Sequence, residues 1–374
     1  MRRRLTIDPW LPLLTLTLVV VGLVMIYSAS APRSMRTFDN SWHFAARQGI
    51  WAALGMLALG VGTLVDYRRW QEWSVPLLGL VVVALAATLI PGIGISAGGA
   101  RRWLGAGGFT LQPSEAAKFV CIVYMSGYLA RHQKLVRGGS SGAAMRPMLV
   151  IGTILALILV EPDLGNAVAI AAVVGSLLFV GGIGWGVIGG LSLLGVAGLA
   201  LAVYLEPYRM TRLTSYLDPW ADPTGSGFQV VQSFLAFGSG GIAGLGLGEG
   251  RQKMFYLPEA HTDFIFSVIG EELGLIGAFA VVALFAAFAW RGLRISRACS
   301  SPFGGYLALG LTLMVVLQAL INMGVSVGIL PNKGLPLPFV SYGGSSLLLN
   351  LFAVGVLINI SKDRYGRRVR GASS

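Results

Sequence analysis

The chain has little charge for its length. Only 12% of its 374 residues are Asp, Glu, Lys or Arg, whereas 55% are hydrophobic. A soluble domain carries about a quarter charged residues, so this composition excludes an ordinary soluble protein. Apolar runs long enough to cross a bilayer recur along the whole sequence. We therefore predict an all-α, polytopic membrane protein with about ten transmembrane helices.

Cysteines and acidic residues are scarce as well. Of the two cysteines, Cys121 falls in a predicted span and Cys299 in a predicted cytoplasmic loop, so we expect no disulfide. The 16 acidic residues against 28 basic ones give a net charge of +12. This excess does not predict nucleic-acid binding, because the basic residues lie in short loops between apolar runs, where they set membrane orientation. No spacing of His and Cys is typical of a zinc site.

The sequence contains no repeat of fixed period and no low-complexity linker, so we expect a single domain over residues 1–374. The first apolar run is too long for a cleavable signal peptide and is expected to be a retained span. Basic clusters at alternate span ends predict that both termini are cytoplasmic. The expected spans are residues 10–27, 48–64, 73–90, 112–129, 147–160, 164–180, 187–205, 263–290, 306–325 and 345–360. The expected outer loops are residues 91–111, 206–262 and 330–344. The loop over 206–262, between spans seven and eight, is the large one.

Span five is expected to be short. Residues 147–160 would make a helix of about 21 Å, whereas the hydrocarbon layer is about 30 Å thick. Glu161 and Asp163 would then lie below the outer surface and face a cavity. The simpler interpretation, which we favour for Asp163, is that it caps the helix of span six.

Polar groups gather where the large loop meets span eight. Glu259, His261 and Asp263 precede a very apolar run. Glu271 and Glu272 lie deeper, inside the predicted span, and acidic residues at membrane depth are functional by default. Partial desolvation would make the Asp263 carboxylate a better general base. The alternative is that Asp263 is the N-cap of span eight. The neighbouring charges, including Lys253, favour a functional role, although His261 alone would more often be structural.

Two further polar stretches lie on the outer side. Glu115 and Lys118 are three residues apart, so they share one face of a helix. They could line a cavity or form a buried pair that fixes packing, and the spacing favours neither. The glycines of residues 244–248 resemble a phosphate-binding loop only superficially, because no strand precedes them. Tight turns are the better interpretation there.

Several long motifs resemble a known family. They are Arg101-Arg102-Trp103, Gln112-Pro113-Ser114-Glu115, the stretch from Tyr256 to Phe266, Gly270-Glu271-Glu272-Leu273-Gly274, and the stretch from Gly334 to Ser346. Together they resemble the SEDS family of shape, elongation, division and sporulation proteins over nearly the whole chain. Residues 250–253 and Asn332-Lys333-Gly334 resemble its division branch more than its elongation branch.

The resemblance implies a peptidoglycan glycosyltransferase of the cytoplasmic (inner) membrane. Such an enzyme polymerises lipid II at the outer face and releases undecaprenyl pyrophosphate. Asp263 matches the family's essential aspartate and would deprotonate the acceptor hydroxyl. Cationic side chains would stabilise the departing pyrophosphate, and the candidates are Arg101, Lys118, Lys253 and Lys333. Further candidate substrate-binding residues are Trp103, Glu115, Glu259, His261, Ser341 and Ser345.

The resemblance also implies partners. These are lipid II, the nascent glycan strand, a class B penicillin-binding protein that cross-links the strand, other cell-division proteins and membrane lipids. A divalent cation, Mg²⁺ or Mn²⁺, could assist pyrophosphate departure, although no convincing ligand set is present. A lipid flippase without chemistry would also fit a polar cavity with charged walls, and a scaffold that only recruits partners is a third possibility. A flippase would tolerate Asn at position 263, whereas a polymerase would not.

Overall fold

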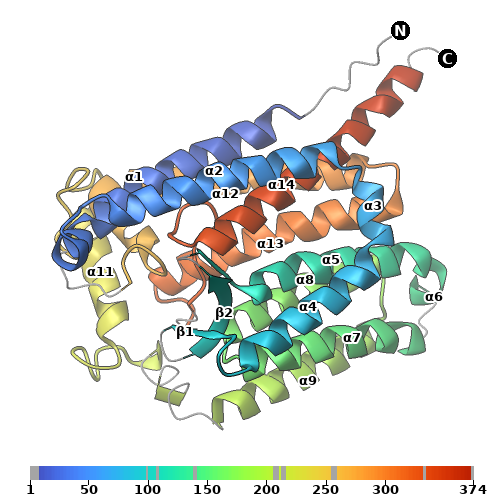
Figure 1. Cartoon of the computed structure of the whole chain (residues 1–374), viewed down its shortest axis with the longest axis horizontal. Helices are drawn as coiled ribbons and strands as arrows, with labels where there is room; N and C mark the ends of the chain where they lie inside the picture. The colour runs from blue at the N-terminus through green and yellow to red at the C-terminus, as the bar shows by residue number, and fades with distance from the viewer. Residues whose placement is uncertain are drawn as a thin grey trace.

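The computed structural model describes residues 8–97, 100–106, 109–137, 141–204, 210–211, 216–253, 259–331 and 334–371. Within these residues the chain is a bundle of long helices that run in broadly the same direction (Figure 1). The start of α1 and the end of α14 lie at the same end of the bundle. The helices are α1 Trp10–Phe38, α2 His43–Leu64, α3 Tyr67–Glu72, α4 Ser74–Leu89, α5 Pro113–Arg131, α6 Gln133–Arg137, α7 Ser141–Val160, α8 Leu164–Gly181, α9 Trp185–Tyr204, α11 Phe228–Gly240, α12 Ile265–Ala298, α13 Pro302–Ser326 and α14 Gly344–Gly371.

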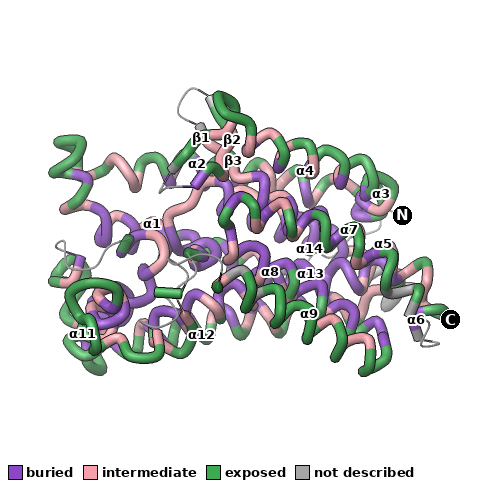
Figure 2. Tube along the Cα trace, turned by 90° about the horizontal axis from the view of Figure 1, so that it is seen from below, coloured by how far each residue is buried: buried purple, intermediate pink, exposed green. Residues whose placement is uncertain are grey.

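Six of the described helices are long and apolar enough to cross a membrane: α1, α2, α8, α12, α13 and, over Gly344–Asp363, α14. Shorter apolar helices occur at Ser74–Leu89, Met145–Val160 and Trp185–Gly198. Buried residues follow α13 and α14 through the centre of the bundle, whereas α9 is largely exposed (Figure 2). The exposed surface carries many large apolar side chains, which is the pattern of a helical bundle whose outer face meets lipid. The chain is therefore a multi-pass membrane protein.

Two predicted helix boundaries are wrong. The helix of the first span continues through Pro32 to Phe38 and ends where Asp39 adopts a left-handed conformation with φ 52°. The apolar run ends near residue 27, but the helix continues for about three more turns with a more polar sequence. The helix of the fifth span begins at Ser141 and is 20 residues long, with Pro147 inside it. The helix therefore starts before the proline that was taken as its first residue, although its apolar part, Met145–Val160, is short, as predicted.

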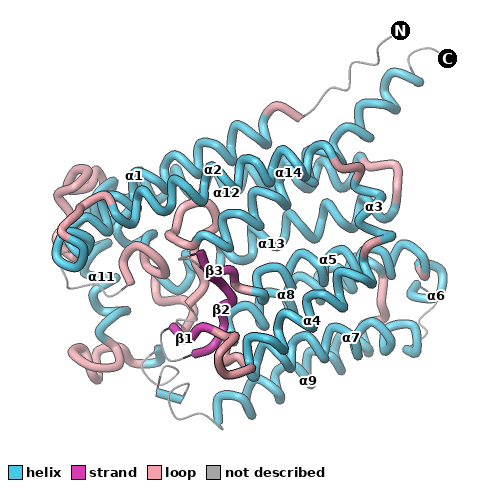
Figure 3. Tube along the Cα trace, in the orientation of Figure 1, coloured by secondary structure: helices cyan, strands magenta, loops and turns pink. Residues whose placement is uncertain are grey.

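The predicted all-helical class holds for most of the chain but misses a small sheet. The loop before α5 forms three antiparallel strands, β1 Ile95–Ala97, β2 Ala100–Ala106 and β3 Phe109–Leu111, in the order β1-β2-β3. They lie where α5 begins (Figure 3). Backbone N–H and C=O groups outside helices need partners, and strand pairing supplies them next to the apolar bundle. The glycine content of this loop hid the pairing from sequence analysis.

The large loop before α12 docks into a break in that helix. Gly274 has φ 66° and ψ −166° inside this helix, so it interrupts the ladder of backbone hydrogen bonds. The N–H groups of Leu275 and Ile276 donate instead to the carbonyls of Gly241 and Ile242, at 2.9 and 3.2 Å. This exchange keeps the backbone paired at a position where unsatisfied groups would be costly.

Glu271 and Glu272 complete this docking. Glu271 accepts the backbone N–H groups of Arg251 and Gln252, and Glu272 accepts that of Gly248. Both carboxylates are buried. Their depth in the bundle, which suggested a function, is explained by their hold on the loop.

Candidate functional site

Asp263 lies just before α12 and does not cap it. The N-cap of α12 is Phe264, with no side-chain capping bond, so the N-cap interpretation of Asp263 is wrong. Residues 259–264 form a compact turn instead. Glu259 has φ 53°, and its carbonyl accepts the N–H groups of Thr262 and Phe264 at 3.1 and 3.4 Å. This turn places Asp263 between the large loop and α12.

Three successive carbonyls of the turn are each held by another part of the chain. The His261 carbonyl accepts the N–H of Tyr342 at 2.9 Å. The Thr262 carbonyl accepts the Ser341 hydroxyl. The Asp263 carbonyl accepts the amide of Asn322 on α13 at 2.8 Å. Ser341, predicted as a substrate-binding residue, is therefore buried and holds the turn in place.

Gly334 borders the Asp263 carboxylate. A methyl group added at Gly334 would lie 3.4 Å from Asp263 Oδ2. Gly334 also has φ 64°, a left-handed conformation that favours glycine. The loop before α14 therefore reaches the side chain of Asp263 as well as its backbone. Lys333, the neighbouring candidate cation, lies outside the described residues.

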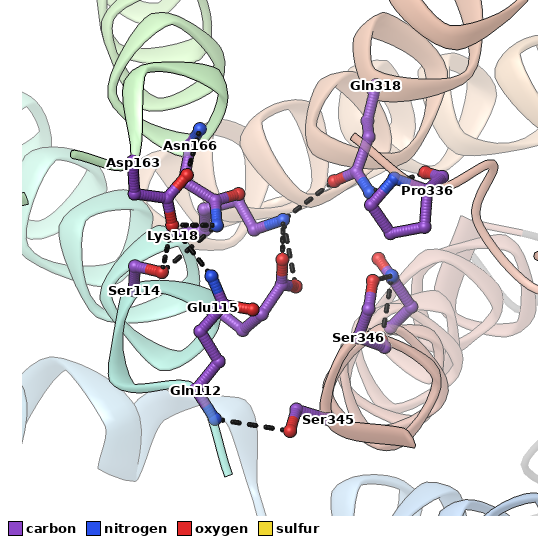
Figure 4. Close-up of polar contacts among 11 residues, drawn as sticks. Gln112, Ser114, Glu115, Lys118, Asp163, Asn166, Gln318, Pro336, Ser345 and Ser346 are labelled. Atoms are coloured by element: carbon purple, nitrogen blue, oxygen red, sulfur yellow. Dashed lines mark hydrogen bonds and ion pairs between the residues drawn. The ribbon is translucent and has the colours of Figure 1, made fainter. Parts of the chain in front are cut away.

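The Glu115–Lys118 pair predicted from spacing is confirmed. Lys118 Nζ lies 2.8 Å from Glu115 Oε2, and each side chain is 3% exposed. Lys118 also donates to Gln318 Oε1 on α13 at 2.7 Å, and Gln318 Nε2 donates to the Pro336 carbonyl at 2.8 Å. Figure 4 shows this chain of contacts from α5 across α13 to the loop before α14. The pair is thus joined to the loop that borders Asp263.

Asp163 caps α8, as favoured from the sequence. Asp163 Oδ1 accepts the backbone N–H of Asn166 at 3.2 Å. Asp163 Oδ2 accepts three more donors, from Gln112 at 2.7 Å, Ser114 at 2.7 Å and the Asn166 amide at 2.9 Å (Figure 4). The Asp163 carboxylate is therefore fully engaged in tying α5 to α8.

Glu161, in the turn between α7 and α8, is buried beside this cap. Thr88 on α4 donates to Glu161 Oε1. Glu161 Oε2 is buried and has no partner among the described residues. The pKa of Glu161 is raised to about 7, mainly by burial and to a lesser extent by the nearby Asp163, while the Thr88 hydrogen bond and Arg102 act in the opposite direction. The group is thus poised to titrate near neutral pH.

Three further candidates lie on the sheet and at the start of α14. On β2, Arg101 is exposed opposite Ser96, and Trp103 is half-buried opposite Ile95. Ser345 is buried at the start of α14, where its hydroxyl accepts the N–H of Gln112 at 3.2 Å and donates to the Thr110 carbonyl at 3.0 Å. Ser345 therefore anchors the sheet to α14.

Lys253 is buried and engaged elsewhere. Its ammonium lies 2.6 Å from Glu272 Oε1 and donates to the Ser28 hydroxyl at 2.9 Å. A charge-assisted contact of this kind neutralises the cation in the loop-docking site. An anionic ligand would have to displace Glu272 to reach it.

Glu259 and His261, which were predicted to act together, have different surroundings. Glu259 and Arg33 form an exposed ion pair at 3.4 Å, of the kind that contributes about 0–1 kcal/mol to stability. His261 is buried against the rings of Phe44 and Tyr342. Burial lowers the pKa of His261 to about 4, so the ring is neutral at pH 7 and acts as a packing residue.

Sequence analysis missed the two amides that link these parts. Gln318 and Asn322 are buried one helical turn apart on α13. The signal was present, because two side-chain amides in a long apolar run need partners. No cluster of three metal-ligating side chains occurs among the described residues.

Comparison with known proteins places the chain in a family. The model of the FtsW, RodA and SpoVE family, described as cell cycle protein, matches residues 9–366. A probable peptidoglycan glycosyltransferase FtsW from Geobacter metallireducens is 48% identical over 354 residues, which cover 95% of this chain and 94% of that protein. Stage V sporulation protein E of Bacillus subtilis is 43% identical over 360 residues, covering 96% and 98%.

A solved structure agrees with the sequence matches. One chain from the structure of a peptidoglycan synthase complex, in which polymerization and crosslinking are coordinated, matches with a TM-score of 0.79 and 30% identity. The match covers 96% of this chain and 99% of that one. The chain therefore belongs to the FtsW, RodA and SpoVE family of cell cycle proteins, as its motifs indicated, and within that family it is FtsW-like.

Proposed function

We propose that this protein is a peptidoglycan glycosyltransferase that polymerises lipid II into glycan strands during septal cell-wall synthesis. Relatives that match almost the whole chain carry this enzymatic name. The observation that carries the proposal is the placement of Asp263. Its backbone is fixed by α13 and by the loop before α14, and Gly334 of that loop borders its carboxylate. A fixed carboxylate at the outer end of a membrane helix suits an acceptor that comes from outside and a donor that lies in the lipid.

Asp263 acts as the general base in this proposal. The carboxylate takes the proton of the acceptor sugar's 4-hydroxyl as that oxygen attacks the anomeric carbon of the donor. The bond between the anomeric carbon and the pyrophosphate oxygen breaks, and undecaprenyl pyrophosphate leaves with the electron pair. General-base assistance of this kind is worth roughly 10²–10⁴-fold in rate.

The cationic candidates differ in how they are engaged. Lys118 and Lys253 are buried against Glu115 and Glu272, whereas Arg101 is exposed on the sheet. We therefore expect Arg101 and Lys333 to contact the pyrophosphate first, with Lys118 acting through its pair with Glu115. A divalent cation remains an expectation, and a chelator with add-back of Mg²⁺ or Mn²⁺ in the polymerisation assay tests it.

The membrane placement follows from the same features. We propose ten spans, formed by α1, α2, α4, α5, α7, α8, α9, α12, α13 and α14, with both termini cytoplasmic in the inner membrane. The common end of α1 and α14 supports an even number of spans, and the basic clusters support the orientation. In a cysteine-free background, cysteine placed at Ser226 should be labelled from outside and cysteine at Ser301 should not. The reverse pattern would contradict the orientation.

The proposed partner is a class B penicillin-binding protein that cross-links the new strand, within a larger division complex. The match to a chain from a peptidoglycan synthase complex supports this pairing. Co-purification of the two proteins from membranes, followed by assay of the complex, tests it. We expect the complex to polymerise faster than this chain alone, and equal rates without co-purification would contradict the pairing.

The decisive assay is polymerisation of labelled lipid II by the purified protein. We expect the wild type to make glycan strands and Asp263→Asn to make almost none while still binding lipid II. Asp222→Asn is the matched control, because Asp222 is an exposed aspartate in the large loop that precedes Asp263. Transport of lipid II across vesicles by Asp263→Asn, without polymer from the wild type, would favour the flippase instead.

A further inference from the structure

Two side-chain amides on α13 face the loop before α14. Gln318 and Asn322 are four residues apart and are both buried, so they lie on one face of the helix. Gln318 donates to the Pro336 carbonyl and Asn322 to the Leu335 carbonyl, each at 2.8 Å. Two consecutive carbonyls of an irregular segment are thus fixed by consecutive turns of one helix.

The side-chain nitrogen of Asn322 donates a second hydrogen bond to the loop segment that carries Asp263. The acceptor is the Asp263 carbonyl, at 2.8 Å. One NH₂ group therefore uses both of its hydrogens to join the segment that carries Asp263 to the segment that carries Gly334. These two segments are more than 70 residues apart in the sequence, and the amide of Asn322 bridges them directly.

This bridge matters because neither segment is held by regular secondary structure. Residues 334–337 belong to no helix or strand, and Pro336 and Pro338 have no N–H to donate. Asp263 lies before the first helical residue of α12. Ser341 and Tyr342 hold the two preceding carbonyls of the turn, and Asn322 adds a direct tie between the Asp263 carbonyl and Leu335, the residue after Gly334.

We propose that Asn322 is a positioning residue for the reaction and acts through Asp263. The amide sets the position of the Asp263 backbone relative to the Gly334 loop, and so the place of the carboxylate in the site. This inference rests on the proposed role of Asp263 as the general base. A base displaced by about 1 Å can lose on the order of 10²-fold in rate, so a bond to its backbone is enough to influence turnover.

The first test replaces Asn322 by side chains with fewer donors. Asn322→Leu keeps a similar shape and removes both bonds, whereas Asn322→Ser retains one donor. We expect kcat, measured per folded molecule with labelled lipid II, to fall roughly 10–100-fold for Asn322→Leu and less for Asn322→Ser, with KM within about twofold of the wild-type value. Loss of folded protein without loss of kcat per folded molecule would overturn the proposal.

Asn350 on α14 supplies the matched control. It is also buried, but its amide donates only within its own helix, to the carbonyl and hydroxyl of Ser346 at 2.8 and 3.1 Å. We expect Asn350→Leu to lower stability while leaving kcat per folded molecule within about twofold of the wild-type value. An equal fall in kcat for Asn350→Leu and Asn322→Leu would show that any buried amide has this effect, and would overturn a specific role for Asn322.

A double variant separates this inference from the role of Asp263. If Asn322 acts through Asp263, then Asp263→Asn/Asn322→Leu should be no slower than Asp263→Asn alone. If the two losses multiply, Asn322 acts independently and the positioning role is wrong, although Asp263 can still be the base. If Asp263→Asn polymerises normally, the proposed base is wrong, whatever the result at Asn322.

Discussion

Asp163 and Asp263 each stand just before a membrane helix, yet the structure uses them differently. Asp163 is the N-cap of α8, and its two oxygens accept four hydrogen bonds from three residues. Asp263 lies one position ahead of the N-cap of α12, where Asn322 bonds its backbone and Gly334 borders its carboxylate. The Asp163 carboxylate thus ties two helices together, whereas the Asp263 carboxylate faces the loop before α14. A place beside a loop at the end of a helix suits a carboxylate that must meet a substrate.

Asp163 bonds to Ser114 on α5, and the buried Glu115–Lys118 pair lies on the same helix. Breaking this pair is expected to have the largest effect on stability. Lys118→Ala leaves Glu115 buried without its 2.8 Å partner, which typically costs about 3–5 kcal/mol. Glu115→Ala/Lys118→Ala removes both charges and should cost less. Thermal unfolding in detergent measures both. A loss for the double variant equal to the sum of the Glu115→Ala and Lys118→Ala losses would show that the two residues are not coupled.

A smaller effect is expected from Asp163 itself. Asp163→Ala removes the cap of α8 and leaves the donors of Gln112, Ser114 and Asn166 without their acceptor. Lost caps and unpaired buried groups predict a loss of about 2–4 kcal/mol. Polymerisation per folded molecule should stay within about threefold of the wild-type rate. A stable Asp163→Ala protein with a large loss of turnover would make the two aspartates alike and contradict the comparison.

The smallest effect concerns pH. The pKa of Glu161 is raised from 4.5 to about 7, mainly by burial, so the folded protein binds this proton more tightly than the unfolded chain does. Its stabilising effect is complete below about pH 4.5 and is lost as pH rises through 7. The difference in free energy of unfolding between Glu161→Gln and the wild type should shift in favour of the variant by about 1–3 kcal/mol from pH 5 to pH 8. Thermal unfolding across this range checks it, and parallel curves for the two proteins would contradict it.

Much of the fold could be predicted from the sequence. The helices at the expected spans and the i, i+3 pair follow from local rules of hydropathy and helix geometry. The extension of α1 to Phe38 and the start of α7 at Ser141 could not, because a helix can continue beyond the bilayer. The strands around Arg101 were missed because pairing between segments overrides a glycine-rich composition.

The candidate site was predicted in part. Asp263 was identified from its place between a polar and an apolar segment. Whether it caps α12 could not be predicted, because the N-cap is Phe264, only one residue further along the chain. Asn322 and Gln318 were missed, because their partners are backbone carbonyls of distant segments. Lys253 was predicted to bind an anion, whereas its ammonium contacts Glu272, a pairing set only by the fold. Tertiary hydrogen bonds of this kind leave no local pattern.

The most direct measurement compares Asp263→Asn with Asp163→Asn in one single-turnover assay of lipid II polymerisation, corrected for folded protein and bound substrate. Both changes remove one negative charge and keep the size of the side chain. The account predicts that Asp263→Asn slows the chemical step by roughly 10²–10⁴-fold, whereas Asp163→Asn leaves it within about threefold of wild type. Equal rates for the two variants, or a fast Asp263→Asn enzyme, would contradict the claim that Asp263 is the catalytic base.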